Sequence, residues 1–433
     1  MNLQTSGDCG VERKLIDHYL HILKEELIVA RGCTEPIALA YAGAVARRHL
    51  GALPDKAVAE CSGNMLKNVR CVIIPNSGNM EGIEAAVLLG AVGGDPDAEM
   101  EVLKNVTDEQ RAQVAQMCRA QVCKVEYLDS PIPLHIAVTL WHGEDSVKVE
   151  IRHTHINVVH IEKNGEVLLH KNDDAPVCNA VYDRSVLNIK GIIEFANTVP
   201  LDDLHPIIEP QIRYNMDIAY EGMSGHYGVG IGRVFRDCYS DNLITRMKAY
   251  TAAASEARMG GCDKPVVINS GSGNQGIATS VPIIIYAREN CIPSEKMYRA
   301  LAFANLLTIY QKEPIGRLSA FCGAVSAACS SGAALTYICG GTEQNIIDTV
   351  DNTLANIPGI FCDGAKVSCA AKIATCLDAA IMSHFMAMRG EAYGAYTGIL
   401  RGTVGETIDS VGHIGRVGMV QTDREIISLM VHK

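Results

Sequence analysis

The chain has 433 residues, of which 48% are hydrophobic and 20% charged, with a net charge of −11. This acidic balance argues against a nucleic acid as the main partner, because neutralising phosphates needs a basic face. The hydrophobic content is typical of a compact globular chain and excludes an intrinsically disordered one.

The chain contains 16 cysteines, and its first residues include no apolar segment of the kind found in secretory signals. We therefore expect a cytoplasmic protein whose reduced thiols serve as metal or cluster ligands, as nucleophiles or as small core residues. The longest uncharged stretch, 318–342, is dominated by Gly, Ala, Ser and Cys. We interpret it as a buried, close-packed helix pair rather than a membrane span.

Apolar residues at helical spacing over 11–30 predict an amphipathic helix. The segment RGCTEP (31–36) follows, and Pro36 suits the first turn of a second helix. Cys33 would then lie at a helix N-terminus, where the helix dipole lowers the pKa of a thiol. Cys33 is therefore a candidate reactive thiolate, with a buried structural thiol as the alternative.

Residues 61–94 are rich in glycine and contain an apolar run, CVIIP (71–75), that predicts a short buried strand before the loop NSGNMEG. The segment PVVINSGSGNQGIATSVPI (265–283) repeats this pattern. The repeat predicts two strand–loop–helix units that face one site, where backbone N–H groups at helix N-termini bind a substrate carboxylate. The candidate binding residues are Asn76, Ser77, Gly78, Asn79, Ser270, Gly271, Ser272 and Asn274.

Residues 121–172 change character, because apolar and polar residues alternate and an Asn-Gly pair interrupts the alternation. Period two with such a turn predicts an antiparallel β meander. His153 and His155 have a His-x-His spacing that can bind zinc, but we favour a polar sheet face. Residues 1–120 and 173–433 show mostly helical spacing. The predicted class is α+β, with a predominantly helical catalytic domain and a small antiparallel β subdomain inserted in it.

Three cysteines, Cys322, Cys362 and Cys369, lie near glycine-rich turns in the least charged part of the chain. A single buried cysteine is usually structural. Three thiolates without a fourth ligand leave one metal corner open, whereas structural zinc takes four ligands. A [4Fe-4S] cluster held by three cysteines would leave one iron free to act on a substrate as a Lewis acid. Lys366 could offer a charge to that substrate or to the cluster, or be a solvated loop lysine.

Five motifs in one order resemble the iron–sulfur L-cysteine desulfidase family, which is related to the α-domain of bacterial iron–sulfur L-serine dehydratases: RGCTEPIALA, IPNSGNMEGIEAAVLLG, VVINSGSGNQGIATSVPI, FCGAVSAACSSGAA and NIPGIFCDGAKVSCAAKI. The resemblance implies that Cys322, Cys362 and Cys369 hold a [4Fe-4S] cluster and that Cys33 is the active-site base. In the serine enzymes the last two cluster cysteines are further apart than here. Those enzymes also carry a Ser/His-rich motif in a separate β domain, which this sequence does not show.

The resemblance implies a lyase that converts L-cysteine to pyruvate, ammonia and hydrogen sulfide. The chemistry agrees, because the elimination needs a base for the Cα proton and an open iron that stabilises the departing sulfur. An L-serine dehydratase with the same cluster is one alternative, and a non-catalytic iron–sulfur or amino-acid sensor is another. We expect an amino-acid substrate, no nucleic-acid or membrane partner, and a homodimer.

Overall fold

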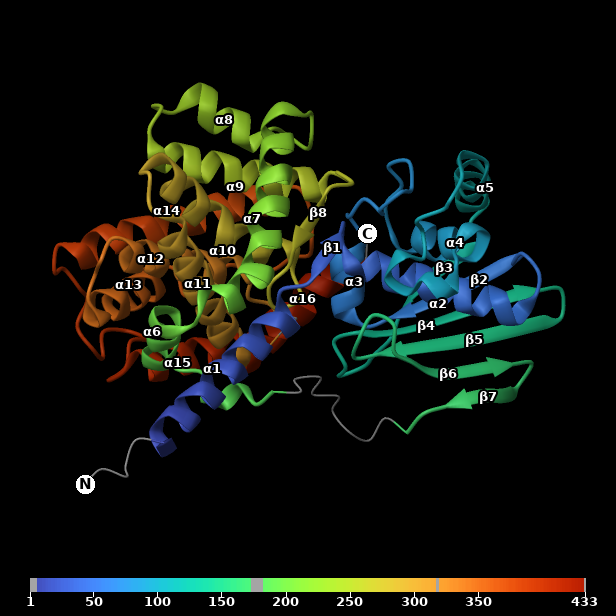
Figure 1. Cartoon of the computed structure of the whole chain (residues 1–433). Helices are drawn as coiled ribbons and strands as arrows, with labels where there is room; N and C mark the ends of the chain where they lie inside the picture. Colours follow the sequence, from blue (N-terminus) through green and yellow to red (C-terminus); the bar gives the residue numbers. More distant parts are fainter. Residues whose placement is uncertain (1–5, 173–181, 317–318, 432–433) are drawn as a thin grey trace.

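The computed structural model describes residues 6–172, 182–316 and 319–431. Its fold is α+β, as predicted, with a sheet at one side of the molecule and a large group of helices at the other (Figure 1). The expected domain boundary at residue 173 lies outside the described residues.

The sheet has the strand order β3-β2-β4-β5-β6-β7. Its strands are β2 (Lys56–Cys61), β3 (Cys123–Tyr127), β4 (His135–His142), β5 (Asp145–Arg152), β6 (Val158–Lys163) and β7 (Glu166–His170). Neighbours from β4 to β7 are antiparallel, which confirms the predicted meander. Asn164 and Gly165 make the last turn with φ of 51° and 85°, the left-handed pair that a tight hairpin needs.

The sheet extends beyond the predicted meander, because β2 pairs in parallel with β3 and antiparallel with β4. Four helices share its hydrophobic core: α2 (Thr34–Leu50), α3 (Gly63–Val69), α4 (Ile83–Gly93) and α5 (Asp108–Arg119). Helix α2 packs on β4 and β5. The predicted division at residue 121 stays a prediction about domains, but residues on both sides of it pack in one core.

A second core unites α1 (Ser6–Glu26) with the helices of the C-terminal half. These are α6 (Ile189–Thr198), α7 (Leu201–Ser224), α9 (Leu243–Met259), α10 (Gly273–Glu289), α11 (Ser294–Ile315), α12 (Ala324–Ile338), α13 (Glu343–Asn356), α14 (Cys369–Met388) and α15 (Val404–His413), with α8 (Ile231–Cys238) packed on α9. The uncharged stretch forms one buried helix, α12, not a pair. Within the described ranges, none of the helices combines the length and apolar character needed to cross a membrane.

Two contacts join the N-terminal part of the chain to its C-terminal half. Strand β1 (Val29–Arg31) pairs with β8 (Pro265–Val267), and α16 (Val420–Val431) packs on α3. The fully buried Lys67 side chain of α3 forms an ion pair of 2.6 Å with Asp423 of α16. The strand predicted at 71–75 does not form, since this segment contributes only an isolated bridge from Ile73 to Glu81.

Candidate active site

A cavity of about 550 Å³ lies where residues of both cores meet. Its wall combines the start of α2, the second glycine loop, the ends of α9 and α11, the turn after β5, and the loops that carry the predicted cluster cysteines. Segments more than 300 residues apart along the sequence, such as Cys33 and Cys362, therefore contribute to one site.

Cys322, Cys362 and Cys369 all line this cavity. Short backbone pairing holds the first two together: Cys322 N–H donates to the Ile360 carbonyl (2.8 Å), and Cys362 N–H donates to the Ala320 carbonyl (2.7 Å). The two thiols are hydrogen-bonded to each other. Cys369 is the first residue of α14, and its thiol contacts the carbonyl of its loop (3.7 Å).

The surroundings favour negative charge at Cys362, whereas burial raises the pKa of Cys369. The hydrogen bond from Cys322 lowers the pKa of Cys362, and the charges of Lys67 and Lys372 act in the same direction. The same hydrogen bond raises the pKa of Cys322, because the thiol of Cys322 is the donor to Cys362. Buried Lys312 also acts on both, although burial lowers its own pKa to about 8. Lysines beside thiols stabilise thiolates.

No three or more His, Cys, Asp or Glu side chains in the described part of the chain are arranged to hold a single metal ion. A four-iron cluster is larger than one ion, and cysteine thiolates are its usual ligands. Here three thiols border a cavity, and backbone N–H groups of Ala324 and Gly364 donate to the sulfurs of Cys322 and Cys362. This donor set fits an iron–sulfur cluster with three cysteine ligands.

Cys33 is the N-cap residue of α2, as predicted, and it faces the same cavity. Its thiol donates a hydrogen bond to Oε2 of Glu35 (3.1 Å). The expectation of a lowered pKa is wrong: burial and the Glu35 carboxylate raise the pKa of Cys33, and the charge of Arg258 opposes them only in part. Cys33 is only 4% exposed, so loss of water outweighs the helix dipole.

The second glycine loop reaches the cavity and the first does not. Ser270, Gly271, Ser272 and Asn274 all line the cavity. The first loop instead turns toward α5, where Asn76 Nδ2 donates to the Leu103 carbonyl (2.7 Å) and Arg111 donates to Asn76. The cavity wall contains none of the candidates Asn76, Ser77, Gly78 and Asn79.

Lys366 also lies outside the cavity wall. Its ammonium forms an ion pair of 2.5 Å with Asp363 in the loop between the last two cysteines. Its charge also acts to lower the pKa of Cys369, although burial raises that pKa overall, so a role for Lys366 beside the cluster ligands stays a prediction.

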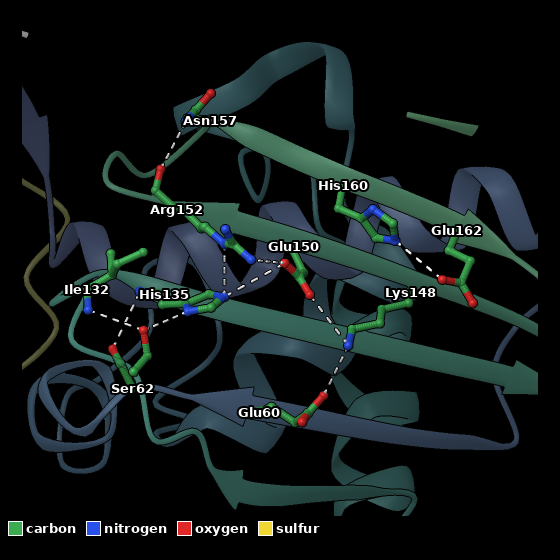
Figure 2. Close-up of polar contacts among 11 residues, drawn as sticks. Glu60, Ser62, Ile132, His135, Lys148, Glu150, Arg152, Asn157, His160 and Glu162 are labelled. Atoms are coloured by element: carbon green, nitrogen blue, oxygen red, sulfur yellow. Dashed lines mark hydrogen bonds and ion pairs between the residues drawn. The ribbon is translucent and has the colours of Figure 1, made fainter. Parts of the chain in front are cut away.

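The expectation that His153 and His155 lie on a polar sheet face is wrong, because β5 ends at Arg152. The turn 153–155 lines the cavity, and His153 has a φ of 66°, unusual for a non-glycine residue. Figure 2 shows the polar network that holds the end of β5: Arg152 donates to His135 (3.2 Å) and to Glu150 (2.8 Å). This network fixes the strand from which the turn enters the cavity.

The polar cavity residues that sequence reasoning missed include Glu35, Arg258, Gln275 and Lys312. Arg258 and Lys312 are the informative cases, because both are charged yet only 5% exposed. Each stands in a segment of mostly small or apolar residues, AAASEARMG and ANLLTIYQKEPI. A basic residue in such a mostly apolar helical segment is the signal that the sequence offers.

Residues 97–428 match the family model described as serine dehydratase alpha chain. A UPF0597 protein of Lachnoclostridium phytofermentans is 45% identical over 424 residues, which cover 97% of this chain and all of that protein. A UPF0597 protein of Treponema denticola is 44% identical over 429 residues, covering 98% of this chain and 99% of the relative. The model's range includes the three cavity cysteines of the C-terminal half. The chain therefore belongs to the serine dehydratase alpha-chain family.

Proposed function

We propose that the protein is an iron–sulfur-dependent carbon–sulfur lyase that converts L-cysteine and water to pyruvate, ammonia and hydrogen sulfide. The observation that carries the proposal is the meeting of Cys322, Cys362 and Cys369 with Cys33 in one cavity. Membership of a serine dehydratase family supports a lyase that eliminates a β-substituent from an amino acid.

Cys322, Cys362 and Cys369 would hold a [4Fe-4S] cluster, which when bound supplies a Lewis-acidic iron for the substrate's β-sulfur. The remaining chemistry belongs to Cys33 and Glu35. Glu35 Oε2 accepts the thiol proton of Cys33, and the resulting thiolate takes the Cα proton of the substrate. The proton held by Glu35 then passes to the departing hydrosulfide, so that hydrogen sulfide leaves and both side chains return to their starting states. The released 2-aminoacrylate tautomerises to an imine, which water hydrolyses to pyruvate and ammonia.

L-Serine dehydration is the second candidate, because the family model is named for a serine enzyme. The spacing of the cysteines favours L-cysteine, since only six residues, DGAKVS, separate Cys362 from Cys369. Asp363 holds this short loop through ion pairs with Lys366 and Lys372.

The test uses protein purified and reconstituted without oxygen. Iron and acid-labile sulfide are counted, and hydrogen sulfide release from L-cysteine is compared with pyruvate formation from L-serine. We expect a cluster and a higher kcat/KM with L-cysteine. A higher kcat/KM with L-serine would replace the proposal with the dehydratase, and cluster binding without turnover of either amino acid would indicate a sensor.

The ligand assignment has its own test. Cys322→Ser removes one thiolate of the proposed set, so we expect loss of cluster absorbance and of sulfide release. Cys376→Ser is the matched control, because Cys376 is buried in α14 but does not line the cavity. Equal iron content in the two variants would contradict the assignment of Cys322.

A further inference from the structure

Two polar side chains in the cavity wall have atoms without a partner among the described residues. Arg258 and Gln275 are each 5% exposed, and both line the cavity. Arg258 Nε and Gln275 Oε1 are buried and form no hydrogen bond within the described ranges. Buried polar atoms almost always have a partner, because leaving them unpaired is unfavourable. Such atoms beside a cavity therefore indicate a ligand of matching polarity.

Arg258 offers a positive charge held in a fixed orientation. Its Nη2 donates to the Gly32 carbonyl (2.9 Å) and its Nη1 to Asn274 Oδ1 (3.3 Å). Both acceptors are neutral, and no carboxylate of the described chain forms an ion pair with Arg258, whereas the half-buried Arg184 is paired with Glu26 and Glu313. A desolvated guanidinium without a counter-ion suits a carboxylate ligand.

Gln275 offers an acceptor in the wall of the same cavity. A methyl group at position 323 would lie 2.3 Å from Cδ of Gln275, so the amide occupies the place that glycine leaves there. Gly323 directly follows Cys322, and this brings the unpaired oxygen of Gln275 next to the proposed cluster ligands. A buried carbonyl oxygen with free lone pairs suits an ammonium donor.

The cavity wall contains a second buried cation, Lys312, which lies near different residues from Arg258. Lys312 lines the cavity and acts on Cys322 and Cys362, while Arg258 acts on Cys33. One cation thus lies on the side of the sulfur ligands and the other on the side of the proposed base. The carboxylate of a bound amino acid is therefore expected at Arg258, with its β-substituent directed toward the three cysteines.

We propose that Arg258 and Gln275 form the subsite that recognises the backbone of a free α-amino acid: the guanidinium binds the α-carboxylate, and Gln275 Oε1 accepts a hydrogen bond from the α-ammonium. The inference rests on the proposed function only in taking the ligand to be an α-amino acid. Because both groups are common to cysteine and serine, this subsite does not choose between them.

The test measures equilibrium binding of three small ligands to anaerobically purified protein by ligand-observed NMR. L-Alanine has both groups but no leaving group, propionate has only the carboxylate, and ethylamine has only the ammonium. We expect Arg258→Gln to weaken binding of L-alanine and propionate by roughly tenfold to a hundredfold and to leave ethylamine unchanged. Gln275→Leu should weaken the binding of L-alanine and of ethylamine and leave the binding of propionate unchanged.

Arg246→Gln is the matched control, because Arg246 is on the same helix but pairs with Glu289 at the surface. If Arg258→Gln does not fold, Arg258→Lys decides: it keeps the charge, so propionate binding should fall only in part and ethylamine binding not at all. Equal weakening of all three ligands, or of none, would overturn the proposal.

The results distinguish a failure of this subsite from a failure of the proposed function. Sulfide release by the wild-type protein without this pattern of ligand selectivity would remove the subsite alone. The expected selectivity without sulfide release would leave the subsite in place and remove the desulfidase.

Discussion

The thiol of Cys33 and the carboxylate of Glu35 form a hydrogen-bonded pair in the cavity wall. Thr34 Oγ1 donates to the same carboxylate oxygen (3.2 Å). Because burial raises the pKa of Cys33, the thiol holds its proton at neutral pH unless a neighbour accepts it. Glu35 is the group in contact that can do so, which makes it the residue on which the proposed base depends.

Glu35→Gln keeps the size of the side chain but removes the proton acceptor. We expect kcat for sulfide release to fall by about a hundredfold or more, while KM and iron content change little. The remaining activity should rise with pH into the alkaline range, since hydroxide must then remove the proton from a thiol of raised pKa. A pH–rate profile measures this.

Two comparisons make the Glu35 test specific. Thr34→Val removes only the second donor to Glu35 and should change kcat by a few-fold at most. Cys33→Ala should keep the cluster and lose turnover. A Glu35→Gln protein with the kcat and pH profile of the wild type would show that Cys33 does not need this acceptor.

Close contact between α2 and α4 depends on a glycine at one position. A methyl group on Gly90 would lie 1.8 Å from the carbonyl oxygen of Ala40, closer than any real contact. We expect Gly90→Ala to force the helices apart and to lower the free energy of unfolding by about 3 kcal/mol. Urea denaturation monitored by circular dichroism checks this.

Gly394→Ala is the control for that substitution, because its nearest neighbouring atom would be 3.9 Å away. A methyl group there meets no backbone, and the loss of chain entropy in the unfolded state slightly favours folding. Similar unfolding midpoints for the two variants would contradict the packing argument.

Asp351 lies in the contact between α13 and α15. Burial raises the pKa of its carboxyl group to about 6. The unfolded chain has the ordinary value near ~4. The native state therefore binds more protons between these values, and this group lowers stability as the pH rises from about 4 to 6. Asp351→Asn should raise the free energy of unfolding at pH 7 by about 1 kcal/mol, allowing for partial exposure to solvent.

At pH 4 the same substitution should have almost no effect, because the carboxyl group is already neutral in the native state. Urea denaturation at the two pH values measures the difference. An equal gain at both would mean that packing, not charge, is responsible.

On the scale of the whole molecule, the ion pair between Lys67 and Asp423 holds α16 on α3 and thereby connects the last helix to the N-terminal part of the chain. Asp423→Asn would leave the fully buried ammonium of Lys67 without a counter-ion. We expect it to lower the free energy of unfolding by about 3 kcal/mol. Thermal and urea denaturation both report this loss.

The exposed pair between Arg48 and Asp97 provides the comparison for that ion pair. Solvent screens it, so Asp97→Asn should leave the unfolding free energy nearly unchanged. A loss for Asp423→Asn no larger than that for Asp97→Asn would show that α16 contributes little to holding the molecule together.

Local patterns predicted what depends on neighbours in sequence. Alternation over 134–152 predicted the strands of the meander, and the position of Cys33 before a proline predicted its place at a helix start. The glycine-rich turns around Cys322 and Cys362 pointed to these two cysteines, and both line the cavity. These features are determined by the sequence itself, because backbone periodicity and capping act within a few residues.

Only the tertiary structure decided which of these elements meet. The two NSG loops look alike in sequence, yet only the one at Ser270 faces the cavity, because the packing of α4 and α5 turns the other away. Burial reversed the expected pKa shift of Cys33, and a turn at the end of β5 brought His153 into the wall. Arg258 is likewise a candidate binding residue only because the fold buries it in the cavity wall. Desolvation and charge at a site depend on contacts between distant segments, and no local pattern records them.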